Sequence, residues 1–231
     1  GFLAPHPLQA GTEWQKFEHT FEAAPTNSGG HAYFVLTCRG PATYSMDNFR
    51  VYRADTPYLA LLPEEEERYR ASGMAAIRTH GPIKTGETTY SMEGYTNPGG
   101  VVQGIPYGNT LPQELSVMER LGTRPWLQIE YHMRPEEWLG LIEYLAAPYD
   151  PGVDTPSAKP WAAKRYAQGR AAPWVEAFDR IYFELANETW NGLFAPWVFG
   201  DMPDEVTGKT LPRGAVYGLM QDYVADLFRS S

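Results

Sequence analysis

The chain has 231 residues, of which 43% are apolar, so it can bury a substantial core and form one large domain or two small ones. Its formal charge of −9 arises from 28 acidic and 19 basic residues without a run of Lys or Arg, which argues against nucleic acid as a partner. A single cysteine, Cys38, excludes an internal disulfide, and no segment approaches the roughly 20 apolar residues that span a membrane.

The residue pattern of positions 12 to 54 is typical of β-strands. Tyr33 to Cys38 is a short β-branched and aromatic run bounded by glycines, which favours a buried strand. The expected strands cover residues 14–23, 31–39 and 44–54. Three strands are too few to close a β-sandwich, so residues 1–54 are interpreted as its C-terminal part, completed by a partner or by preceding residues.

From residue 55 onward, expected strands alternate with expected helices. The strands cover 57–63, 74–81, 124–132 and 180–188, and the helices cover 64–72, 110–122, 134–147 and a segment within 214–228. Both ends of the helix at 110–122 are indicated by the sequence, because Thr110 and Gln113 match a capping box and Gly122 is typical of the residue that ends a helix. The last helix carries Val216, Met220, Tyr223, Val224 and Leu227 at helical spacing.

Four successive β/α units predict an α/β fold, since neighbouring parallel strands need crossover helices. A doubly wound sheet is one arrangement, but the candidate site described below favours a partial (β/α)8 TIM barrel. Such a barrel takes about 250 residues, and only about 175 follow residue 55. Residues 55–231 are therefore expected to form about the first four β/α units, with the remainder of the barrel as a further segment or chain.

Three of the expected strands end in polar and aromatic side chains at their carboxyl ends, where functional groups gather in α/β folds. One strand ends in Arg78 and His80, the next in Glu130 and His132, and the last in Asn187, Glu188 and Trp190. A single such residue would be interpreted as a solvated loop side chain, but three strand ends of this kind indicate a site. Two histidines far apart in sequence are weak evidence for a metal, so no metal or cofactor is expected.

These residue types suit glycoside cleavage, which requires an acid to protonate the leaving oxygen and a second carboxylate to attack the sugar or activate water. Glu188 is the candidate acid. Asn187 would bind a sugar hydroxyl, Arg78 would orient a carboxylate, and Trp190 would stack on a sugar ring. The other candidate substrate-binding residues are His80, His132, Glu130 and Asn191.

Several segments resemble one large enzyme clan, the retaining glycoside hydrolases with (β/α)8 barrels. "RIYFELANETWNG" resembles the clan's fourth-strand signature, in which an Asn–Glu pair ends the strand and the Glu is the acid/base. "GMAAIRTHG" and "LGTRPWLQIEYH" resemble the second and third strands, and "YLAAP" followed by "KRYAQGRAAPW" is similar to α-L-arabinofuranosidase-type members. "EWQKFEHTFEA" and "YSMDNFRVYRA" resemble the closing strands of a carbohydrate-binding jelly roll.

The resemblance implies a retaining hydrolase of O-glycosidic bonds in a polysaccharide or oligosaccharide, secreted or periplasmic, with Glu188 as acid/base. In the clan the nucleophile is a Glu at the end of the seventh strand, and no residue here matches it, so it is expected outside this chain, which alone need not be active. Glu93 and Glu130 are the alternatives within the chain. Glu184 shares the strand parity of Glu188 and is expected to be a buried structural acid that pairs with a base such as Arg78.

Other interpretations stay open. A non-catalytic carbohydrate-binding or scaffold protein would keep the cleft without turnover. A non-sugar α/β enzyme is a further class, although the chain lacks a glycine-rich phosphate loop, a Gly-x-Ser-x-Gly elbow and a His-Glu-x-x-His helix. The sequence "NET" at 187–189 also matches an N-glycosylation sequon, but it directly follows an apolar strand.

Overall fold

A computed structural model of the chain describes residues 6–22, 35–46, 49, 51–56, 61–79, 91–97, 110–129, 131, 133–192 and 198–231. The contacts divide the chain into two units, Gly1–Tyr58 and Leu59–Ser231. From the sequence, the boundary was predicted at residues 54 and 55.

The described residues of the first unit contain no strand, so the expected antiparallel strands of a β-sandwich are not found there. Trp14 is 74% exposed, and Phe17 and Phe21 are also exposed. An aromatic pattern predicts which side chains share a face, but a strand also needs a pairing neighbour and a layer to pack on. The pattern alone was therefore insufficient.

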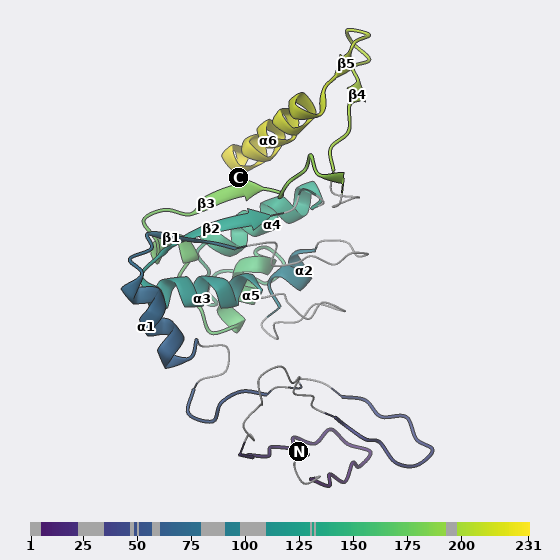
Figure 1. Cartoon of the computed structure of the whole chain (residues 1–231), viewed down its shortest axis with the longest axis vertical. Coiled ribbons are helices and arrows are strands. Elements are labelled where there is room, and N and C mark those ends of the chain that lie inside the picture. Colours follow the sequence, from purple (N-terminus) through teal and green to yellow (C-terminus); the bar gives the residue numbers. More distant parts are fainter. Residues whose placement is uncertain are drawn as a thin grey trace. The chain divides into compact units, whose positions relative to one another are not determined.

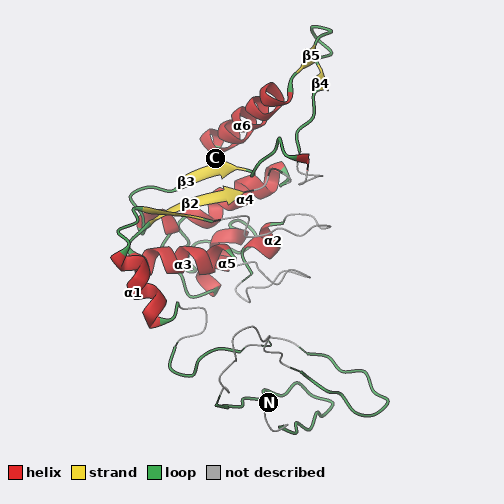
Figure 2. Cartoon of the chain, viewed as in Figure 1, coloured by secondary structure: helices red, strands yellow, loops and turns green. Residues whose placement is uncertain are grey.

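The second unit is built on a parallel sheet of three strands in the order β1-β2-β3. The strands are β1 (Ala76–Arg78), β2 (Arg124–Ile129) and β3 (Tyr182–Leu185). The helices are α1 (Pro63–Ala71), α2 (Met92–Tyr95), α3 (Leu111–Leu121), α4 (Pro135–Ala146), α5 (Pro160–Ala167), the 3₁₀ helix η1 (Trp174–Glu176) and α6 (Arg213–Ser230) (Figures 1 and 2). An antiparallel pair, β4 (Met202–Pro203) and β5 (Thr210–Leu211), precedes α6.

The predicted partial (β/α)8 barrel is wrong. In the described part of the chain, β1 and β3 each pair on one side only, with β2, and the sheet does not continue into a barrel wall. Of the expected strand at 57–63, residues 57–60 lie outside the described residues, and Pro63 begins α1. Alternating strands and helices require parallel neighbours, but they do not determine how many strands pair or whether the edges meet.

Several predicted elements are confirmed with their end signals. Helix α3 follows Thr110, whose backbone N–H donates to Oε1 of Gln113 at 3.1 Å. It ends at Gly122, whose φ of 70° lies in the left-handed region that glycine adopts without strain. These local contacts explain why this helix was readable from its sequence.

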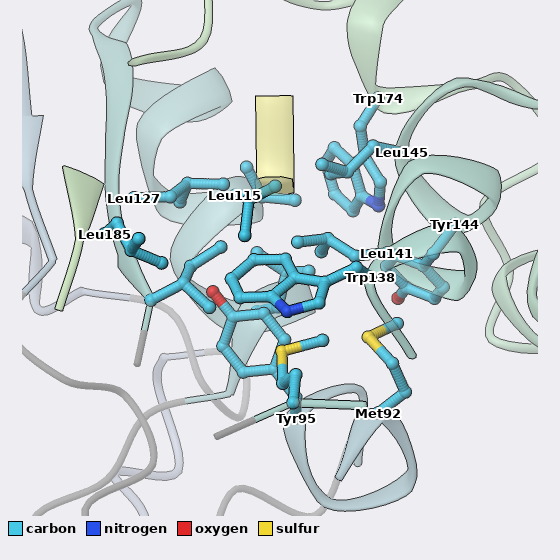
Figure 3. Packing of buried hydrophobic residues seen from close by; sticks show 14 residues of the cluster. Met92, Tyr95, Leu115, Leu127, Trp138, Leu141, Tyr144, Leu145, Trp174 and Leu185 are labelled. Atoms are coloured by element: carbon cyan, nitrogen blue, oxygen red, sulfur yellow. The ribbon is translucent and has the colours of Figure 1, made fainter. Parts of the chain in front are cut away.

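The two faces of the sheet differ in character because side chains alternate along each strand. One face packs against the helices and carries Leu127, Ile129 and Leu185, which join a buried cluster with side chains of α2, α3, α4, η1 and α6 (Figure 3). By the strand register, the opposite face carries Arg78, Trp126, Gln128, Tyr182 and Glu184. The sheet therefore has one apolar, helix-covered face and one polar and aromatic face.

Helices α4 and α5 approach each other closely at Gly140. A Cβ at that position would lie 2.4 Å from Nε1 of Trp161, so no larger residue fits without movement. The two helices also cap each other: Oε1 of Glu143 accepts from the backbone N–H of Trp161 at 2.8 Å, and the fully buried Arg165 donates to the carbonyl of Tyr144 at 2.7 Å. Side chains of α4 belong to the buried cluster, and Trp161 of α5 packs against that cluster.

Candidate functional site

Arg78 connects the two outer strands of the sheet at the polar face. Its Nε and Nη2 atoms donate to the two carboxylate oxygens of Glu184, each at 2.6 Å. Gln128 of the central strand lies in register with Glu184 and is fully buried. The predicted pairing of Arg78 with Glu184 is thus confirmed, and it is bidentate, which orients both groups.

The same arginine reaches the residue next to the candidate acid. Nη2 of Arg78 donates to Oδ1 of Asn187 at 2.8 Å. The hydrogen bonds to Glu184 raise the pKa of Arg78, so the side chain stays a cation. With Oδ1 accepting from Arg78, the Asn187 amide has a set orientation, and its NH₂ group is a donor that can meet a hydroxyl.

The chain turns sharply after β3. Ala186 has φ of 58° and Glu188 has φ of 48°, both in the left-handed region that residues with a Cβ seldom adopt. Each such residue costs about 1–2 kcal/mol, so the surrounding contacts must hold the turn. One of them continues the ladder, since the N–H of Ala186 donates to the carbonyl of Ile129 at 2.6 Å.

Glu188 lies on this turn with an exposed side chain. Nδ2 of Asn191 donates to its Oε2 at 2.9 Å, and the N–H of Asn191 donates to the Glu188 carbonyl at 2.8 Å. Trp190 is 63% exposed, so most of its surface is accessible to solvent. Arg78 and Asn187 therefore form one group, and Glu188 and Asn191 form another on the same turn.

Three predicted site residues, His80, Glu130 and His132, lie outside the described residues. Their convergence with Arg78 and Asn187 stays a prediction. Among the described residues, no group of three or more His, Cys, Asp or Glu side chains is placed to hold a metal ion. No helix in the described ranges is both long and apolar enough to cross a membrane.

A second set of residues near the turn was missed by the sequence interpretation. Tyr217 of α6 donates through its hydroxyl to the carbonyl of Leu185 at 2.9 Å. Phe199 and Arg213 also bond to the turn, at Thr189 and Trp190. Tyr217 follows Val216 directly, and no periodic signal distinguishes it, because its partner is a backbone atom 32 residues away.

Comparison with known proteins found no match: no family model, no curated protein and no solved structure matches the chain.

Proposed function

We propose that this chain carries the acid/base part of a retaining glycoside hydrolase that cleaves O-glycosidic bonds of a polysaccharide or oligosaccharide. The observation that carries the proposal is the Asn187–Glu188 pair on a strained, tethered turn at the carboxyl end of a parallel strand, with Asn187 oriented by Arg78. Strained backbone at a strand end is found preferentially at functional sites.

In this mechanism Glu188 donates a proton to the leaving oxygen and then removes a proton from the incoming water. The exposed side chain of Glu188 supports this assignment, because a general acid must be accessible to the substrate. Asn187 donates its NH₂ group to a sugar hydroxyl, and the exposed ring of Trp190 stacks on an adjacent sugar. We assign none of the described residues as the nucleophile, the second carboxylate that this mechanism requires.

Glu184 is a poor choice of nucleophile. Both of its oxygens accept from Arg78, so attack on an anomeric carbon would require it to leave this ion pair. Its function in the proposal is to hold Arg78, which in turn holds Asn187.

The test is the Glu188→Gln variant of the intact protein, assayed with aryl glycosides whose leaving groups are either good or poor. Removing a general acid is expected to slow cleavage of the poor leaving group by about 10²–10⁴-fold, because that step needs the proton. Formation of the glycosyl-enzyme from a good leaving group should change far less. Glu205→Gln, which alters another exposed acid of the second unit, is the matched control and should leave both rates unchanged.

Equal losses with both leaving groups, or no loss, would show that Glu188 is not the general acid. Sugar binding without release of reducing ends, in the parent protein and in the variant alike, would favour a non-catalytic carbohydrate-binding protein instead.

A further inference from the structure

The turn that carries Asn187 and Glu188 is bonded from one side by the segment that leads into α6 and by α6 itself. Three carbonyls at or beside the turn accept hydrogen bonds from this segment. The contacts are Tyr217 Oη to the Leu185 carbonyl at 2.9 Å, Phe199 N–H to the Thr189 carbonyl at 2.9 Å, and Arg213 Nη1 to the Trp190 carbonyl at 3.2 Å. We call Tyr217, Phe199 and Arg213 the α6 clamp.

The position of Leu185 explains why the first of these contacts matters. The Leu185 C=O and the Ala186 N–H belong to one trans peptide group, so they point in opposite directions, and the N–H bonds to Ile129 of β2. The Leu185 carbonyl therefore faces the outer side of β3, where no further strand of the described chain pairs with it. The Tyr217 hydroxyl supplies the partner that a neighbouring strand would otherwise provide.

Tyr217 is held in place by its own surroundings. Its ring packs edge to face on Phe199, with centroids 5.7 Å apart, and its hydroxyl accepts from Nε2 of Gln221 at 3.2 Å. Burial raises the pKa of Tyr217, and the nearby negative charge of Glu184 raises it further. The hydroxyl therefore keeps its proton and stays a donor to the Leu185 carbonyl.

The clamp acts at the point where the backbone is strained. The Leu185 carbonyl is joined to the peptide nitrogen of Ala186, the first residue with positive φ, and Thr189 and Trp190 directly follow Glu188, the second. Residues in such conformations persist only where the surrounding structure determines them, so loss of a clamp contact should let the turn relax.

We propose that Tyr217 is a positioning residue that holds the Asn187–Glu188 turn in its reactive geometry. The inference rests on the proposed function for its kinetic consequence, but the hold on the turn is measurable without turnover. It assigns α6 a function beyond covering the sheet.

The test compares Tyr217→Phe with Tyr223→Phe in the intact protein. Both variants remove one hydroxyl from the same helix, and Tyr223 is 42% exposed and lies outside the clamp. Amide hydrogen exchange at Phe199 and Asn191 is the first readout, because both amides bond to turn carbonyls. Tyr217→Phe should accelerate their exchange about threefold to tenfold, the range expected for the loss of one hydrogen bond, and Tyr223→Phe should not.

The second readout is the selectivity between leaving groups. Because a misplaced acid impairs only the step that needs a proton, Tyr217→Phe should lower kcat/KM for a poor leaving group about tenfold and for a good one less than twofold. Arg213→Met, which removes the contact to the Trp190 carbonyl, should act in the same direction with a smaller effect.

Unchanged exchange at Phe199 and Asn191 in Tyr217→Phe would overturn the inference, as would equal kinetic losses for both leaving groups. If Glu188→Gln leaves turnover unchanged, the proposed function fails, and hydrogen exchange then decides by itself whether Tyr217 holds the turn. A general loss of stability would accelerate exchange throughout α4 as well, and that pattern would also contradict a local clamp.

Discussion

The two faces of the three-stranded sheet are stabilised in different ways. The face toward the helices carries Leu127, Ile129 and Leu185, which lie in a close-packed apolar cluster. The opposite face carries Arg78 and Glu184, joined by an ion pair whose side chains are partly exposed. On the first face shape decides which residues are tolerated, while on the second face charge and hydrogen bonding decide.

This difference separates the residues that stabilise the fold from the residues of the proposed site. Dispersion and burial add up over many contacts, so the helix-covered face can supply most of the folding free energy. Partly exposed ion pairs contribute little to stability, but they orient side chains such as Asn187. Substitutions on the two faces should therefore differ in size, in pH dependence and in salt dependence.

The largest effect is expected from Leu141→Ala on α4. Leu141 is fully buried in the cluster, so the substitution loses transfer free energy and leaves a cavity, which together lower the free energy of unfolding by about 2–5 kcal/mol. Leu139→Ala on the same helix is the control, since Leu139 is 38% exposed and its loss should cost much less. Urea denaturation measures both, and similar costs would refute the contrast between packed and exposed positions.

A partly buried acid on α3 is expected to make the free energy of unfolding depend on pH. Oε2 of Glu114 on α3 is buried and has no hydrogen-bond partner among the described residues, and burial raises the pKa of Glu114 from 4.5 to about 8. The folded state therefore binds the proton more tightly than the unfolded state. The contribution of Glu114 to the free energy of unfolding should be greatest below pH 4.5. It should fall by a few kcal/mol in total as the pH rises toward 8.

Glu114→Gln removes this titration while keeping the shape of the side chain. The variant should be more stable than the parent at pH 8 and should lack most of the decline between pH 5 and 8, as measured by urea unfolding at a series of pH values. Parallel pH profiles for the two proteins would show that Glu114 is not the group responsible.

Substitution of glycine by alanine should change stability less than Leu141→Ala does. The direction of the change should depend on whether the added Cβ meets another helix. Gly140→Ala would place a Cβ 2.4 Å from the Trp161 ring, so it should destabilise by about 1–3 kcal/mol despite the higher helix propensity of Ala. Gly218→Ala on α6 meets no atom within 4 Å and should stabilise by up to about 1 kcal/mol. Thermal unfolding distinguishes the two, and equal shifts in Tm would contradict the packing argument.

The smallest change in stability is expected on the polar face. Arg78→Met removes the ion pair to Glu184, and because both side chains are partly exposed, the cost should be about 1 kcal/mol and should shrink at high salt. Arg229→Met, at an exposed ion pair on α6, should have no measurable effect. If Arg78→Met instead cost as much as Leu141→Ala, the two faces would not differ as described.

Much of the local structure was predictable from adjacent residues. The three strands lie within the predicted ranges, and α3 begins and ends at its predicted signals, because caps and side-chain periodicity act over one or two turns. The pairing of Arg78 with Glu184 was also predictable, since strand parity places both on one face. In α6, Val216 and Val224 are buried as their spacing indicated, whereas Tyr223 is exposed.

The sequence by itself determined the three strands of the parallel sheet, the helices α1, α3, α4 and α6, and the polar residues at the ends of β1 and β3, because these depend on neighbours in the chain. Only the tertiary structure decided the number of paired strands, the left-handed backbone of Ala186 and Glu188, and the contact of Tyr217 with Leu185. Those features join atoms far apart in sequence, and their free energy comes from a partner surface that no local pattern describes.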